Sequence, residues 1–232
     1  MDEASWDTCA EPSEMLNFLQ TSSWNSERKL RLVACAFCRA VEDLLTDACY
    51  RRALDLAERY ADGLVDAGAL LEAHWAAARA ERHTDEYEWS EDKKGLLMAA
   101  NAVGWATTVR EPPDPPAYLA GCAATGANNA SLYAGSPESE VKAGQSALLR
   151  DVLGPLPFRP MTVHPSVLGW NDGTVVRLAQ AIYSARRFDD LPVLADALEE
   201  AGCNDADILA HCRAVGPHVR GCWVIDLLLG KQ

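Results

Sequence analysis

Apolar residues recur along the chain with the 3.6-residue period of an α-helix. Between Ser26 and Leu45 they form one stripe, and arginines occupy the opposite face. The stripe consists of Leu30, Val33, Ala34, Phe37, Val41, Leu44 and Leu45. Asp47 is of a type that caps helices and is expected to begin the next helix, which Gly63 ends. Because no segment shows a convincing strand-like alternation, the pattern predicts an all-α protein.

The middle of the chain continues the helical pattern. One segment is expected to place five side chains on a single apolar face: Leu70, Leu71, His74, Trp75 and Ala78. The stretch 95–105 is apolar nearly all round, which is typical of a buried central helix. Ser136, Pro137 and Glu138 combine a cap, a first-turn proline and an acidic N-terminus, so they predict a helix start. Gly154 and Pro155 are expected to stop this helix.

The last third of the chain contains several short helical segments. Four prolines between Pro155 and Trp170 predict an extended connector. New helices are expected to begin at Asn171 and at Asp189, and further ones are expected over 205–213 and 218–229. Together the segments predict a multi-helix orthogonal bundle or stacked helical hairpins.

A proline-rich run marks the best candidate for a boundary. Residues 111–116 read Glu-Pro-Pro-Asp-Pro-Pro, which no helix interior accommodates. We therefore expect an amino-terminal helical region over 1–110 and a carboxyl-terminal helical region over 136–232. Between them, the stretch 111–135 is rich in Ala, Gly and Asn after the prolines and is expected to be a connector or a weak helix. Packing of the whole chain as a single domain stays open.

The charge restricts the partners that the protein can take. Thirty-four acidic residues against twenty-one basic ones give a formal net charge of −13. Direct binding to nucleic acid, or to an anionic membrane, needs a basic surface. The start Met1-Asp2-Glu3 lacks the pattern of a signal peptide, and no apolar run is long enough to span a bilayer. We expect an acidic cytoplasmic protein whose partner is another protein, with its oligomeric state open.

Eight cysteines are many for 232 residues. A disulfide framework is typical of short secreted chains, so we expect reduced thiols that mostly pack in the core. Cys35 and Cys38 form a C-x-x-C pair inside a predicted helix. Redox enzymes place this motif at a helix N-terminus, so packing is the favoured interpretation here.

Metal-binding residue types cluster near the carboxyl end. Cys203, His211, Cys212, His218 and Cys222 lie within twenty residues, and thiolate and imidazole are ligands that suit zinc. Within a helix, His218 and Cys222 would share a face, whereas the adjacent His211 and Cys212 would point about 100° apart. The zinc hypothesis therefore takes Cys203, Cys212, His218 and Cys222 as ligands. In the alternative, the cysteines pack in the core and no cofactor is bound.

Catalytic signatures are missing from the sequence. Gly121 and Gly126 have the glycine spacing of a phosphate-binding loop, but Ala127-Asn128 stands where that loop needs Lys-Ser/Thr. The catalytic residues are accordingly unknown. Trp6 and Trp24 flank the first short helix and would form an interaction surface if exposed. In the alternative, this segment folds back over the bundle.

Several short motifs near the two ends of the chain form a distinctive set. They are Arg-Lys-Leu-Arg-Leu (28–32), Ala-Cys-Ala-Phe-Cys-Arg (34–39), Leu-Leu-Arg-Asp-Val-Leu-Gly (148–154), Pro-Phe-Arg-Pro (157–160) and the segments 194–203, 207–213 and 218–224. This set resembles a paralogous family of helical proteins that is abundant in planctomycete bacteria. The resemblance implies a bacterial, cytoplasmic origin and points to no mechanism.

Three functions stay open from the sequence. The first is a non-enzymatic helical module for protein interaction or regulation, which predicts an exposed apolar patch. The second is a zinc-binding helical protein with a structural site near the carboxyl end. The third is an enzyme of unidentified class, which requires a deep pocket lined by perturbed titratable groups.

Overall fold

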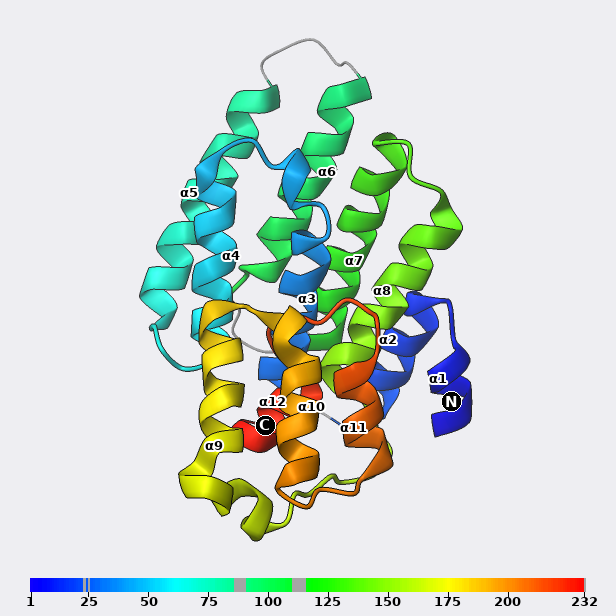
Figure 1. Cartoon of the computed structure of the whole chain (residues 1–232). Helices are drawn as coiled ribbons and strands as arrows, with labels where there is room; N and C mark the ends of the chain where they lie inside the picture. Colours follow the sequence, from blue (N-terminus) through cyan, green and yellow to red (C-terminus); the bar gives the residue numbers. More distant parts are fainter. Residues whose placement is uncertain (23, 25, 86–90, 110–115, 232) are drawn as a thin grey trace. The chain divides into compact units, whose positions relative to one another are not determined.

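Helices are the only regular secondary structure in the described part of the chain (Figure 1). The computed structural model describes residues 1–22, 24, 26–85, 91–109 and 116–231. Over these residues it contains α-helices and two short 3-10 helices, and no strand. The all-α prediction is therefore confirmed. None of the described helices is long and apolar enough to cross a membrane.

The chain divides into two compact units, Met1–Leu149 and Arg150–Gln232. The division falls near the end of α8 (Glu138–Leu153), outside the stretch 111–135, for which the sequence predicts a connector or a weak helix. Most of that stretch forms α7 (Pro116–Tyr133), and residues 111–115 lie outside the described part. The Ala/Gly-rich composition reflects close packing, because a Cβ at Gly126 would lie 3.0 Å from the carbonyl oxygen of Met98 on α6 (Glu91–Ala106).

The first unit is built around a buried helix, α3 (Glu27–Arg39). The other helices of this unit are α1 (Glu3–Thr8), α2 (Pro12–Thr21), η1 (Glu42–Leu44), α4 (Ala48–Ala61) and α5 (Ala67–Asp85), with α6, α7 and most of α8. The predicted apolar stripe of α3 is buried, but the opposite face is not simply solvated. Arg31 is only 8% exposed, and it donates hydrogen bonds to the carbonyl oxygens of Ala106 and Thr108. Arg31 thereby satisfies carbonyl groups at the end of α6, where a helix leaves them without partners.

Local capping rules predicted several boundaries correctly. The side chain of Asp47 accepts a hydrogen bond of 2.8 Å from the backbone N–H of Cys49 at the start of α4. Gly63 adopts a positive φ of 69° after α4 ends. The expected continuous helix to Leu45 is wrong, because α3 ends at Arg39.

One predicted face in the first unit is also wrong. On α5, Leu70 is fully buried, but Leu71 and Trp75 are 40% and 50% exposed. Ala73 and Ala77 complete the buried face instead. Small alanines carry a weak apolar signal, so the pattern of large side chains misplaced the buried face.

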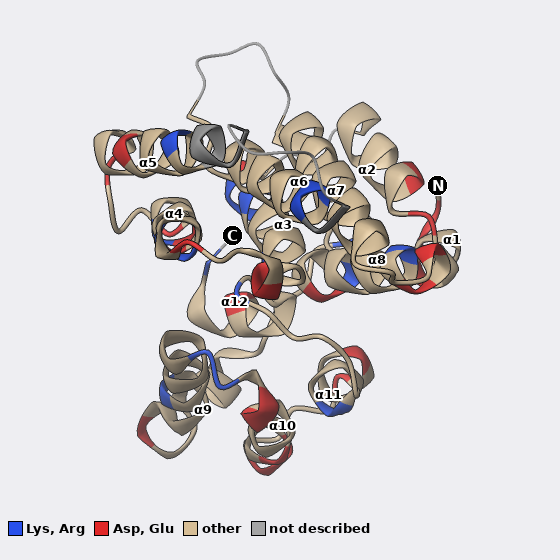
Figure 2. Ribbon diagram, turned by 90° about the horizontal axis from the view of Figure 1, so that it is seen from above, with Lys and Arg blue, Asp and Glu red and all other residues tan. Residues whose placement is uncertain are grey.

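The second unit contains α9 (Pro165–Ala185), η2 (Phe188–Asp190), α10 (Leu191–Glu200), α11 (Ala206–Arg213) and α12 (Trp223–Leu229). Acidic residues lie in the second half of α10 and in the first turn of α11 (Figure 2). Large apolar side chains from these helices form its core, among them Tyr183, Leu194, Ile208 and Trp223.

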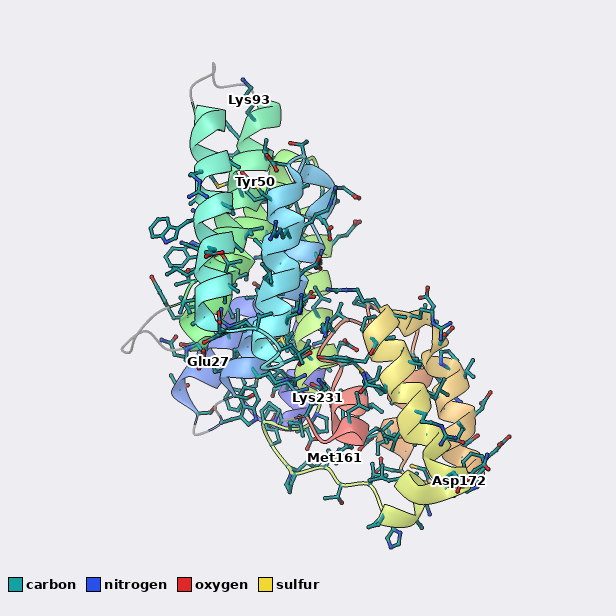
Figure 3. The ribbon with its side chains drawn as sticks, turned by 90° about the vertical axis from the view of Figure 1, so that its left-hand side faces the viewer. Glu27, Tyr50, Lys93, Met161, Asp172 and Lys231 are labelled. Atoms are coloured by element: carbon teal, nitrogen blue, oxygen red, sulfur yellow. The ribbon has the colours of Figure 1, made fainter. Side chains whose placement is uncertain are left out.

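Two expectations for this unit are corrected. The extended connector ends before Pro165, which begins α9 with His164 as its cap. A bend then interrupts α9 at 170–173, and Asp172 lies there with a positive φ of 56° (Figure 3). The last helix starts at Trp223 rather than at His218.

Candidate metal centre

Four side chains of the second unit converge on one point. They are Asp151, His211, His218 and Cys222, and their candidate ligand atoms all lie within 4.8 Å of one another. The side chains of Asp151 and His218 are 3% and 10% exposed, and Cys222 is fully buried. This is a compact, mixed set of oxygen, nitrogen and sulfur donors within the protein interior.

Two helices supply the first pair of donors. Asp151 lies in the last turn of α8, and Gly154, with a φ of 50°, follows that helix. His211 lies near the end of α11. At the start of the same helix, the side chain of Asp205 accepts hydrogen bonds from the backbone N–H groups of Asp207 and Ile208. Asp151 and His211 therefore both lie on α-helical backbone, which fixes the direction of each Cα–Cβ bond.

A tight turn supplies the second pair. The N–H of Cys222 donates to the carbonyl oxygen of Val219 at 3.0 Å, and Gly221 takes a φ of 96°. Such a positive φ at the third residue of a turn favours glycine. His218 and Cys222 are thus close because the chain turns between them. The predicted helical spacing is not the reason.

Hydrogen bonds link all four side chains. Nδ1 of His218 lies 2.6 Å from Oδ1 of Asp151, and Nε2 of His211 lies 3.2 Å from the same oxygen. Nε2 of His211 is also 3.2 Å from Sγ of Cys222. The second carboxylate oxygen of Asp151 accepts a bond of 2.9 Å from the backbone N–H of Val219. Asp151 is therefore the hub of the cluster.

The surroundings determine the proton on His218. Its Nε2 lies 3.2 Å from the carbonyl oxygen of Ala214, and a carbonyl only accepts, so this nitrogen carries a proton. Nδ1 is then the nitrogen that faces Asp151. Metal-binding histidines commonly donate the N–H of one ring nitrogen to a carbonyl and bind the metal with the other. His218 already has this arrangement.

Burial and charge shift the pKa values in the cluster. Burial alone opposes ionisation of Asp151, but hydrogen bonds from the two histidines outweigh it and lower the pKa of the carboxyl. Burial also opposes protonation of His218, yet its bond to Asp151 raises the pKa of this imidazole. Burial, together with the nearby Asp151 charge, raises the pKa of the Cys222 thiol well above its ordinary value. These shifts favour the ionised carboxyl of Asp151, the protonated imidazole of His218 and the neutral thiol of Cys222.

A tetrahedral metal would require the donor atoms to move by up to about 1 Å. Zinc bonds of about 2.0–2.3 Å place neighbouring ligand atoms roughly 3.3–3.8 Å apart. The two 3.2 Å separations around His211 are near this range, and Asp151 and His218 would have to separate by about 0.7 Å. That short contact is a hydrogen bond, and a bound cation would replace its proton. Donor atoms as far as 4.8 Å apart would have to approach by about 1 Å.

The structure places two of the four predicted ligands in this cluster. His218 and Cys222 belong to it, and Cys203 and Cys212 do not. Cys212 is buried in the hydrophobic core, where burial raises the pKa of its thiol to about 12. Cys203 is half-buried and packs against the same core.

Asp151 and His211 were not among the predicted ligands. The zinc hypothesis takes Cys212 rather than its neighbour His211 as a ligand, whereas in the structure His211 faces the cluster and Cys212 faces the core. Asp151 lies in the predicted helix that Gly154 ends, sixty residues before the other donors. One signal was present, because a carboxylate in the last turn of a helix is disfavoured by the helix dipole and needs a compensating partner.

Other candidate features of the sequence have structural roles. Cys35 and Cys38 are both buried inside α3, and burial raises the pKa of Cys38 well above its ordinary value. Trp6 is fully buried, so the amino-terminal segment packs onto the first unit. Trp24 is half-buried. Trp6 and Trp24 therefore do not form an exposed tryptophan surface.

Comparison of the chain with protein-family models, curated proteins and solved structures yields no match. The resemblance to a planctomycete family stays a prediction.

Proposed function

We propose that this protein binds zinc through Asp151, His211, His218 and Cys222 of its second unit. The convergence of four donor atoms within 4.8 Å in a largely buried position carries the proposal. Imidazole and thiolate favour zinc over magnesium or calcium, which prefer oxygen ligands. The carbonyl of Ala214 and the N–H of Val219 supply the outer hydrogen bonds that orient His218 and Asp151.

The donor count favours a structural role for the metal. Catalytic zinc sites usually have three protein ligands and keep one position open for water or substrate. Here four protein side chains are available, and two of them are essentially buried. A zinc ion in this cluster would cross-link the end of α8, α11 and the turn that precedes α12. The proposed function is thus a zinc-stabilised helical module.

Elemental analysis of the full chain, purified without added metal, tests the proposal. We expect close to one zinc per chain, retained on dialysis against buffer and removed by a strong chelator. Removal should lower the thermal midpoint of the second unit, because binding free energy contributes to folding. Zinc well below about 0.1 per chain after reconstitution with zinc chloride would refute the proposal.

Two matched pairs of variants locate the site. Cys222→Ser and His211→Gln should each reduce the bound zinc strongly. Cys203→Ser and His164→Gln are their controls, since both residues lie outside the cluster, and they should leave the zinc content unchanged. Circular dichroism verifies that each variant is folded. Equal zinc in Cys222→Ser and Cys203→Ser would show that the metal binds elsewhere.

A second candidate function rests on an exposed apolar pair in the first unit. Leu71 and Trp75 lie one helical turn apart on α5 and are 40% and 50% exposed. Exposed tryptophan and leucine side chains together favour contact with another protein. A double variant, Leu71→Ser with Trp75→Ser, should lose a partner that co-purifies from native cells. Val193→Ser, which removes an exposed apolar side chain from α10, is the control.

A further inference from the structure

The first unit contains a hollow of about 530 Å³ that takes no part in the metal centre. Residues of α2, α6, α7 and α8 line it, and α6 and α7 pack along each other there (Figure 1). Part of the space exists because Gly121 has no side chain: no atom outside its own helix lies within 4 Å of the position that a Cβ would take. The volume lies in the range of small-molecule binding sites.

Side-chain amides dominate the polar lining of this hollow. Six of them come from four different helices: Asn17, Gln20, Asn101, Asn128, Asn129 and Gln145. Each amide offers both donors and acceptors. Trp105 Nε1 donates to Oδ1 of Asn101 at 3.1 Å, and Nε2 of Gln145 donates to the carbonyl oxygen of Ala124 at 2.9 Å. Oδ1 of Asn128 is buried and has no partner among the described residues. Groups of this kind suit a ligand that also donates and accepts, such as a polyhydroxylated ring.

The charge of the hollow disfavours anionic ligands. Among the described residues that line it, Lys142 is the one cation. Its Nζ lies 3.2 Å from a carboxylate oxygen of Glu11 and 2.9 Å from one of Glu138. The ammonium group is therefore paired with two carboxylates, and the described lining residues offer no other cation to a phosphate or carboxylate.

Two aromatic side chains provide an apolar wall. The rings of Trp105 and Tyr118 lie 6.3 Å apart with an interplanar angle of 82°, so they form a corner. A flat base is best held between parallel rings, whereas a corner accommodates the thicker, puckered ring of a sugar against one face. A second hollow of about 350 Å³ shares Asn101 and Trp105 with the first, which leaves room for a further ring.

From these observations we propose that the hollow of the first unit binds a neutral carbohydrate, at least a disaccharide. The amides bind its hydroxyl groups, and Trp105 and Tyr118 contact its apolar ring face. This proposal is independent of the metal centre, because no residue is shared between the two sites.

Calorimetric titration of the full chain tests the proposal with defined probes. These are cellobiose, maltose, sucrose, trehalose and chitobiose, each raised to about 20 mM to cover weak affinities. Glucose 6-phosphate probes anion binding, and adenosine probes a flat base. At least one disaccharide should give saturable binding with a Kd below about 5 mM, and it should bind more tightly than both glucose 6-phosphate and adenosine.

A filling variant and a matched control locate the binding. Gly121→Leu should fill the hollow from α7 and weaken the sugar by about tenfold or more. Gly144→Leu makes the same change on α8, outside the hollow and equally free of neighbours within 4 Å, and should leave the affinity unchanged within about twofold. Should Gly121→Leu unfold, Thr125→Leu replaces it, since Thr125 is an exposed lining residue on the same helix.

Several results would overturn the proposal. One is that no disaccharide gives saturable binding. Another is that adenosine or glucose 6-phosphate binds more tightly than every disaccharide tested. A third is equal sugar affinity in the filling variant and its control. Sugar binding that is lost only in the filling variant supports it.

Discussion

The metal centre and the amide-lined hollow are opposite kinds of polar site. At the centre, charged groups in the second unit are buried and bonded to one another, with Asp151 as the hub. In the hollow of the first unit, neutral amides line an accessible space, and Lys142, the one cation among the described lining residues, is paired with carboxylates. Buried charge is costly unless it is paired, whereas neutral amides can face water without a partner. The first arrangement suits an ion, and the second suits a neutral ligand with many hydroxyl groups.

This difference also concerns stability. Removing one member of the buried cluster leaves the others without partners, so the second unit depends on it. When one amide is removed from the hollow, water can form the hydrogen bonds that its former partner loses. The two regions should therefore respond very differently to equally conservative substitutions.

The largest effect is expected at the hub of the cluster. Asp151→Ala removes the acceptor for two histidines and for the N–H of Val219, and it should lower the free energy of unfolding by about 3–5 kcal/mol. Asn129→Ala in the hollow should cost no more than about 0.5 kcal/mol. Urea denaturation followed by circular dichroism measures both. Similar losses in the two variants would contradict the distinction between the sites.

A glycine beside the cluster should show how closely the second unit is packed. A Cβ at Gly154 would lie 2.5 Å from the ring of Trp223, and the residue also has a positive φ of 50°. Gly154→Ala should therefore destabilise by about 3 kcal/mol, from overpacking and backbone strain together.

Gly202→Ala is the matched control for that substitution. Gly202 has a φ of 87° but no neighbour within 4 Å of the Cβ position, so only the backbone strain remains. The cost should be about 1 kcal/mol, measured in the same denaturation experiment. Equal losses at the two glycines would show that the Trp223 contact contributes nothing.

The smallest effects should distinguish the packed and open sides of α7. A Cβ at Gly126 would lie 3.0 Å from Ala102 and from the backbone of Met98, so Gly126→Ala should destabilise by about 1–2 kcal/mol. Gly121 lines the hollow, and no atom outside its own helix lies within 4 Å of the position that a Cβ would take. Gly121→Ala should therefore raise the free energy of unfolding by about 0.5–1 kcal/mol through helix propensity. Thermal denaturation checks the sign of each change. A gain at Gly126 would mean that α6 and α7 are not in close contact there.

Much of the fold could be predicted from local patterns. The cap at Asp47, the helix start at Glu138 and the short helix after Asp205 all follow from rules about adjacent residues. One error arose where two local rules competed. Prolines break helix interiors, and this rule predicts a connector at Pro165. A proline in the first turn is tolerated, however, and α9 begins at Pro165.

The candidate site could be predicted only in part. His218 and Cys222 were identified by residue type, but for a geometric reason that the turn at Gly221 replaces. Whether His211 or Cys212 faces the cluster depends on the rotation of α11, which the core decides when it buries Ile208 and Cys212. Asp151 joins from sixty residues away, and no local spacing encodes such a contact.

The sequence by itself determined the all-helical architecture, the acidic charge and the supply of thiol and imidazole groups near the carboxyl end. These properties depend on composition and on periods of three to four residues. Only the tertiary structure decided which donors meet, and that a hollow opens beside Gly121. Both depend on how helices rotate and approach one another as they bury apolar surface, and this balance is set by the whole core rather than by any one segment.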